Sequence, residues 1–395
     1  MSEHGGASDD PFRNLPPMLR ELARQLSQQQ GGGWEMTRQF AVNVATDGQW
    51  EPNIDPTDRF EIEQLARVAE LQIGTATGLS TSVTGRSLTI IPVNRTQWVY
   101  RTIEDYRPLL EVLGSSLHDT TDSFEAESDD PFAWLAPLMQ MFGPTLLALV
   151  AGTMVGHLAR RALGQYELPI PRPPEDELQL VLPNLDKFGS DWSLPQQDVR
   201  LWVCLHEVAH HAVLGLPHVR SHLDKLLRTY LSAFETSTIS LDEQFSHLDV
   251  SDPAALASLP DRFGDPDLLL GVIQSPTQRE LLPQLEAVVA AIVGYVDYVM
   301  DQVGSSLITS YSMVAEALRR RRVEAAPSDR FVERLFGLEM SQATYDRGER
   351  FVHGVVERAG ENGLARLWES ERTLPTPAEI EAPGLWLARI DLPED

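Results

Sequence analysis

Residues 201–216 read LWVCLHEVAHHAVLGL and contain the order His206-Glu207-x-x-His210. On a helix, residues four apart lie one turn apart on the same face, with about 5–6 Å between their Cβ atoms, so both imidazoles can reach one metal ion. Glu207 lies about 100° round the helix from His206, where its carboxylate can contact a metal-bound water. This arrangement is typical of zinc hydrolases.

Flanking residues predict a helix over 194–214 around this motif. Ser193 and Gln196 have the Ser-x-x-Gln spacing of a capping box, and Gly215 with Pro217 would end the helix. The two histidines continue a row of valines, so they fall on a buried face. Buried imidazoles need partners for their nitrogens, and a metal ion or hydrogen bonds within the core can both supply them.

Length, net charge and cysteine content limit the core size, the partners and the location that can be expected for this protein. The chain has 395 residues, 42% of them hydrophobic, which is enough to bury a large core. Its net charge of -26 repels phosphate backbones and anionic membrane surfaces, so we expect neither nucleic acid nor membrane as a partner. The single cysteine, Cys204, fits a small core residue, and one thiol fits a reducing compartment. The start, MSEHGGASDDPF, does not resemble a signal peptide, so a cytoplasmic location is expected.

The chain divides into a flexible N-terminal arm, residues 1–33, and a single large domain, residues 34–395. The arm is poor in apolar side chains and rich in glycine and glutamine. Periodicity in the domain predicts mainly helices with a few short strands. The expected elements include a helix from Phe60, a strand at 88–92, a helix from Asn94 and an acidic loop at 114–131.

Two apolar segments carry alternative interpretations. Residues 132–158 lack Lys, Arg, Asp and Glu and are long enough to span a bilayer, but Gly143-Pro144 interrupts them. A buried helix whose Gly152 and Gly156 pack against the motif helix is favoured. Residues 178–183, LQLVLP, predict a strand whose free edge could pair with an extended peptide substrate.

A second helix is predicted after Ser275, with Gln278 completing a capping box. Its body, residues 287–300, is apolar except for Asp297 and two tyrosines. A carboxylate in such a segment is costly to bury alone, so Asp297 should contact the metal or a ligand histidine, or else face solvent or an arginine. The arginine run 319–322 is interpreted as a solvated helix end.

Several further stretches resemble one known family, the zincin-like metallopeptidase type 2 family. This family contains the His-Glu-x-x-His motif, was long classed as a domain of unknown function, and in some genomes is labelled as associated with deazaflavin coenzyme biosynthesis. The resemblance covers about residues 43–388. It lies in RLWVCLHEVAHH, LGQYELP, LVLPNL, GYVDYVMD, LFGLE, YDRGERFVHGVVERAG, LARLWES and TLPTPAEI.

The resemblance implies a mostly helical zincin-like protein with zinc as its cofactor, His206 and His210 as metal ligands and Glu207 as general base. One departure concerns the third ligand. Where similar proteins tend to have Glu-Gly-His-x-Asp, this chain has Val-Gly-Tyr-Val-Asp, ending at Asp297, and valine cannot bind a metal. The remaining candidates for that position are Asp297, His222, His218 and Glu349.

The sequence therefore predicts a mainly α, zincin-like protein in which the metal helix packs against a second, acidic and apolar helix. We interpret it as a zinc-dependent hydrolase, most simply a metallopeptidase, acting on a peptide or small-molecule substrate. The alternative is a catalytically impaired binding or scaffold protein that lacks a complete third-ligand site.

The motif generates a first prediction. His206→Ala or His210→Ala should abolish stoichiometric zinc, because each removes one of the few protein ligands of the ion. Metal analysis of protein purified without added zinc tests this. A variant that retains one tightly held zinc per chain would contradict the metal assignment.

Overall fold

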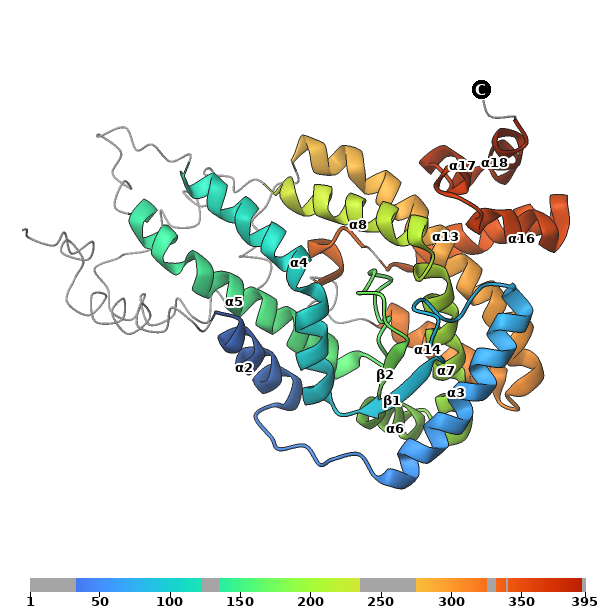
Figure 1. Ribbon diagram of the computed structural model, residues 1–395, viewed down its shortest axis with the longest axis horizontal. Coiled ribbons are helices and arrows are strands. Elements are labelled where there is room, and N and C mark those ends of the chain that lie inside the picture. Colours follow the sequence, from blue (N-terminus) through green and yellow to red (C-terminus); the bar gives the residue numbers. More distant parts are fainter. Residues whose placement is uncertain (1–32, 123–134, 235–274, 325–331, 339, 393–395) are drawn as a thin grey trace, which may run out of the picture.

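The protein is described by a computed structural model that covers residues 33–122, 135–234, 275–324, 332–338 and 340–392. It is built mostly of helices and has two short strands within these residues (Figure 1). This confirms the mainly α prediction. The predicted arm, residues 1–33, lies almost wholly outside the described residues.

The elements follow one another along the chain as helices interrupted by two strands. They are α2 (Gly33–Thr46), α3 (Pro56–Thr77), β1 (Thr89–Val93), α4 (Arg95–Asp122), α5 (Leu135–Arg161), β2 (Glu177–Val181), α6 (Leu182–Asp191), α7 (Gln196–Leu214), α8 (Pro217–Ser232), α13 (Pro276–Leu307), α14 (Tyr311–Val323), α16 (Gln342–Ala365), α17 (Pro377–Glu381) and α18 (Pro383–Ile390). The predicted acidic loop at 114–131 is wrong over its first part, because α4 continues to Asp122, and the rest lies outside the described residues.

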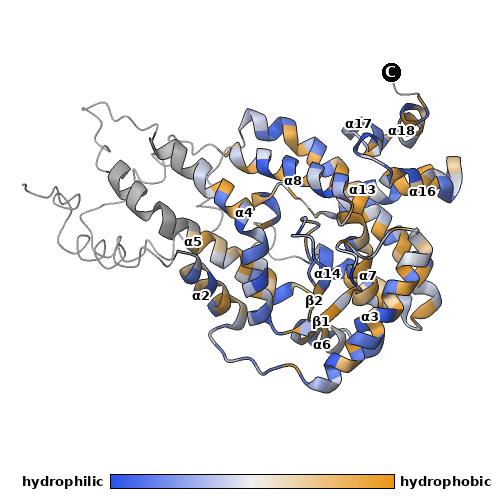
Figure 2. Ribbon diagram, in the orientation of Figure 1, coloured by the Kyte–Doolittle hydropathy of each residue, from blue (hydrophilic) through white to orange (hydrophobic). Residues whose placement is uncertain are grey.

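The two strands pair in parallel, with Thr89 opposite Glu177 and Val93 opposite Val181. Both are largely buried and apolar (Figure 2). The other edge of β2 is also occupied, because the Val181 N–H donates to the Leu163 carbonyl at 2.9 Å and Gly164 forms an antiparallel bridge with Leu180. The prediction that this strand offers a free edge to a substrate is therefore wrong.

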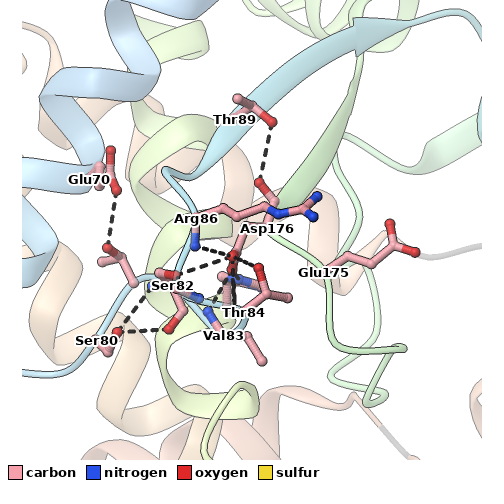
Figure 3. A network of polar contacts seen from close by, with 12 residues as sticks. Glu70, Ser80, Ser82, Val83, Thr84, Arg86, Thr89, Glu175 and Asp176 are labelled. Carbon is pink, nitrogen blue, oxygen red and sulfur yellow. Dashed lines mark hydrogen bonds and ion pairs between the residues drawn. The ribbon is translucent and has the colours of Figure 1, made fainter.

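A carboxylate at the start of β2 holds the loop that leads into β1. Asp176 accepts hydrogen bonds from the backbone N–H groups of Val83, Thr84 and Arg86 and from the hydroxyls of Ser82 and Thr84 (Figure 3). Burial alone would raise the pKa of Asp176, but these donors bring its pKa well below the usual value. The loop is thus fixed by one buried charge.

α5 packs against α2, and its glycines explain the close approach. A Cβ at Gly152 would lie 2.8 Å from the Thr37 carbonyl oxygen, and one at Gly156 would lie 2.6 Å from the Val44 Cβ. The small residues therefore face α2, and the prediction that they pack against the motif helix is wrong. The part of α5 before residue 148 is described only as backbone.

α13 crosses the interior and touches α7, α8 and α16. Its Ser275 cap has both bonds of the predicted capping box. Gly294 lies against α16, where its added Cβ would come within 2.3 Å of the Gly348 carbonyl carbon. Among the described residues, α13 is the helix long and apolar enough to span a membrane, and 67% of its most apolar window is buried inside the protein. The predicted packing of the motif helix against an acidic, apolar helix is confirmed by α7 and α13.

The Asp176 cluster yields a stability prediction. Asp176→Asn should lower the free energy of unfolding by about 3 kcal/mol, because charged hydrogen bonds from several backbone and hydroxyl donors to a buried carboxylate are lost. Since the pKa of Asp176 is lowered in the folded state, this stabilisation is present above the unfolded pKa of about 3.9 and is lost as the pH falls below it. Urea unfolding of both proteins between pH 7 and pH 3 measures the difference. If the difference in free energy of unfolding between the two proteins stays constant down to pH 3, the stabilising role of the Asp176 charge is contradicted.

Candidate active site

α7 carries the motif, and its start differs from the prediction. Pro195 is the N-cap and no side chain caps the helix. Ser193 adopts a left-handed conformation with φ 52°, and the Gln196 side chain donates to the Asp186 carbonyl at 2.8 Å. The predicted Ser193–Gln196 capping box is therefore wrong, because Gln196 binds α6 instead. The end of the helix at Leu214 is as predicted, since α8 begins with Pro217.

The two histidines lie side by side with ring centroids 4.3 Å apart. His210 Nδ1 is 3.1 Å from the His206 carbonyl oxygen. A carbonyl only accepts, so Nδ1 carries the proton and Nε2 keeps its lone pair. Burial lowers the pKa of His206 to about 4 and that of His210 to about 3. Both rings are therefore neutral at pH 7, which is the form that binds a metal.

Glu207 is held in a buried backbone cradle and is 2% exposed. Its Oε2 accepts from the backbone N–H groups of Gln165 and Tyr166, each at 2.8 Å. Its Oε1 lies 3.5 Å from His206 Nδ1. A Cβ at Gly164 would come within 2.3 Å of the Glu207 carboxyl carbon, so glycine is needed there. Burial raises the pKa of Glu207 to about 7, although the two amides oppose that shift.

The cradle is fixed from behind by side chains of α4 and of the segment before β2. The Trp98 indole N–H donates to the Gly164 carbonyl at 2.9 Å. Arg172 donates to the Gln165 carbonyl at 2.7 Å and pairs with Asp105 at 2.9 Å. These contacts, with the bridge to β2, lock the segment that binds Glu207. The sequence did not predict these contacts, although the LGQYELP stretch, which contains the accepting residues, was among those that resemble the family.

Tyr166 connects this cradle to the Asp176 cluster. Its ring stacks on His210 with centroids 6.0 Å apart, and its hydroxyl is 3.0 Å from His211 Nδ1. His211 Nε2 lies 3.8 Å from Asp176 Oδ1. The loop before β1, the motif helix and the cradle are therefore joined through buried polar side chains.

The motif residues line a cavity of about 240 Å³ whose other walls carry charges of both signs. Arg161 pairs with Glu167 at 2.8 Å and with Glu333 at 3.5 Å, and Arg321 pairs with Glu167 at 3.3 Å. Burial would raise the pKa of Glu167, but Arg321 and Arg161 hold it below the usual value. The sequence analysis identified neither glutamate.

Asp297 forms two hydrogen bonds with Arg322, at 3.0 and 3.1 Å, and its side chain is 33% exposed. The Arg322 guanidinium also lies over the Tyr345 ring, 4.0 Å from its centroid. Of the contacts expected for Asp297, the one with an arginine is present in the structure. Its role as a metal ligand stays a prediction. The interpretation of residues 319–322 as a solvated end holds for Arg319 and Arg320 and is wrong for Arg321 and Arg322, which line the cavity.

The other candidate third ligands lie elsewhere. His222 Nδ1 is 3.0 Å from Glu371, and Glu349 lies 4.0 Å from His353 on exposed turns of α16. His218 lies one turn before His222 on α8. Within the described residues, none of these three side chains lines the cavity of the motif histidines.

Comparisons with known proteins identify a family and a similar solved structure. The chain matches the zincin-like metallopeptidase family over residues 33–387. It belongs to this family. Among solved structures, a protein from Chloroflexus aurantiacus described as a candidate hydrolase with a novel fold is similar, with a TM-score of 0.63 and 24% identity. That match covers 91% of this chain and 99% of the other, and it concerns the fold. No curated protein matches the chain.

A zincin-like family implies a zinc ion, and the donor chemistry of the histidine pair fits one. Two adjacent neutral imidazoles supply nitrogen ligands, and the hydrogen bond of His210 Nδ1 leaves its Nε2 for the metal. Catalytic zinc sites usually have three protein ligands. In the part of the chain that the structure describes, no group of three or more His, Cys, Asp or Glu side chains is assembled to hold a metal.

The Asp297–Arg322 pair generates a prediction that separates two roles. We expect Asp297→Asn to weaken zinc binding about tenfold, because it leaves the positive charge of Arg322 unbalanced near His206. The double variant Asp297→Asn/Arg322→Gln should restore the affinity. Competition with a chromophoric chelator at fixed ionic strength measures the dissociation constants, and Arg319→Gln is the matched control on the same helix.

A different result would assign Asp297 the role predicted from the sequence. If Asp297 is itself a ligand, the double variant stays as weak as the single one, and Arg322→Gln alone binds zinc more tightly because it frees the carboxylate.

Proposed function

We propose that this protein is a zinc-dependent hydrolase that cleaves peptide bonds, with His206 and His210 holding the metal and Glu207 moving the proton. The observation that carries the proposal is the position of Glu207, a buried carboxylate beside two adjacent neutral imidazoles in a cavity of about 240 Å³. A bound zinc would supply Lewis acidity and lower the pKa of a coordinated water.

Glu207 has the properties that general base catalysis needs. Burial raises the pKa of Glu207 above that of an exposed carboxyl group, which favours the return of a proton as well as its uptake. The two amides engage Oε2, so that Oε1 remains on the side of His206. In the proposed reaction Glu207 accepts a proton from the attacking water and delivers it to the leaving amine. The locked cradle keeps the carboxylate in place through both transfers.

The recess around the motif supports a peptide rather than a small substrate. A second cavity, of about 340 Å³, adjoins the first and shares Trp202, Leu318, Arg322 and Tyr345 with it. Together the two cavities can accept several residues of an extended ligand. Because both edges of β2 are engaged, this ligand would bind in the cavities and not by strand pairing.

The scaffold alternative rests on a specific observation, namely the lack of an assembled three-donor group among the described residues. It predicts a chain that binds ligands without consuming them. Zinc content and turnover together decide between the two functions.

The test of the proposal is Glu207→Gln. This variant should keep its zinc, because the two histidines are unchanged, and should lose about 10²–10⁴-fold in rate, because the proton acceptor is gone. Mass spectrometry of new termini in a pool of peptides, incubated with zinc-loaded protein, measures cleavage. Glu63→Gln, which changes an exposed glutamate of α3, is the control and should behave like the parent.

Cleavage that persists in Glu207→Gln at the parental rate would refute the role of Glu207. A parent chain that holds zinc and cleaves no peptide in the pool would instead favour the scaffold alternative.

A further inference from the structure

The second cavity lies between α13, α14 and α16, next to the motif residues. Trp202 of α7 stands in the wall common to both cavities, with its ring stacked on His206 at a centroid distance of 4.9 Å. The Asp297–Arg322 pair stands at the same boundary, since Arg322 lines both cavities. If a peptide binds at the histidines, the side chain next to the bound peptide group would therefore lie at this second cavity.

The charges of the second cavity are predominantly negative. Its lining contains five carboxylates against two arginines, namely Asp297, Asp301, Glu316, Asp346 and Glu349 against Arg319 and Arg322. Asp297 and Glu316 are neutralised by these arginines. Asp301 accepts from the Tyr311 hydroxyl at 2.6 Å and Asp346 from the Gln342 amide at 2.6 Å. In the described part of the chain, no lysine or arginine pairs with Asp301, Asp346 or Glu349.

Aromatic rings form much of the remaining wall. Trp202, Tyr298, Tyr311 and Tyr345 all line this cavity. Aromatic faces attract cations, and carboxylates complete the charge pairing, so this combination suits a side chain with an apolar stem and a positive end. Within the chain, the Arg322 guanidinium stacks on the Tyr345 ring, which is one example of a cation on an aromatic face.

Trp202 supplies an independent indication of a ligand. It is 5% exposed, and its indole N–H has no hydrogen-bond partner in the structure. Buried polar groups in folded proteins are nearly always paired, so an orphaned donor in the wall between two cavities marks a place where a ligand carbonyl would complete the bonding. A peptide passing from the histidines to the acidic cavity carries such carbonyls.

We propose that the second cavity is a specificity pocket for a basic side chain, so that the substrate is a peptide with lysine or arginine beside the scissile bond. The inference rests on the proposed function. The side chain's stem packs against the aromatic rings, and its charge faces Asp301, Asp346 and Glu349. The net charge of -26 adds long-range attraction for such peptides.

The experiment uses the zinc-loaded Glu207→Gln chain, so that bound peptides stay intact. Isothermal titration compares acetyl-Ala-Lys-Ala-amide with the same peptide carrying norleucine or glutamate at the centre. The lysine peptide should bind at least about tenfold more tightly than the norleucine peptide at low salt, and the ratio should shrink at high salt.

Two double variants separate the pocket from the overall charge. Asp301→Asn/Glu349→Gln should bring the lysine-to-norleucine ratio close to one, and asparagine keeps an acceptor for the Tyr311 hydroxyl. Glu63→Gln/Glu177→Gln removes the same charge from exposed sites and should keep the ratio. Equal binding of lysine and norleucine peptides, or the same ratio in both double variants, overturns the proposal.

The failure of the proposed function can be distinguished from the failure of the pocket proposal. A lysine preference in binding, with no cleavage of any peptide by the zinc-loaded parent, overturns the hydrolase and leaves the pocket. Cleavage that is indifferent to lysine and arginine overturns the pocket and leaves the hydrolase.

Discussion

The rest of the candidate site depends on the pairing of Glu207 with the backbone amides of Gln165 and Tyr166. A carboxylate this deeply buried is costly unless it is hydrogen-bonded, and backbone donors are the least mobile partners available. The donating segment is itself fixed by β2, Trp98 and Arg172. The two-stranded sheet therefore helps to position Glu207, and both edges of β2 are engaged within the protein.

Charge compensation follows the same rule throughout the cavity. Arg161 and Arg321 converge on Glu167, and Arg322 is held by Asp297. In a low-dielectric interior, each of these charges would be strongly unfavourable without its partner. The pairs also hold the charged groups in fixed positions around the histidines, and the proposed reaction would use such preorganisation.

Sequence patterns predicted what depends on local spacing. The step from His206 to His210 and the cap at Ser275 are properties of a few consecutive residues, and both appear in the structure as expected. The failures involve distant partners. Ser193 has a left-handed backbone and does not cap α7, and the Gln196 side chain donates to a carbonyl of α6. Local spacing does not reveal this distant partner. The partners of Glu207 lie 41 and 42 residues away in the chain, beyond the reach of any helical period.

The arginine run shows why composition alone could not place the site. Arg319 and Arg322 are one turn apart on α14, and both carry the same charge. Arg319 is 62% exposed and pairs with Glu316 of its own helix, whereas Arg322 reaches Asp297 of α13 and stacks on Tyr345 of α16. Near these partners, Gly294 and Gly348 let α13 and α16 approach closely. Close packing of α13 and α16 thus brings Asp297 and Tyr345 within reach of Arg322 of α14 at the boundary between the histidine cavity and the acidic one. Asp297 lines the acidic cavity, and its ion pair with Arg322, which lines both cavities, connects it to the histidine cavity.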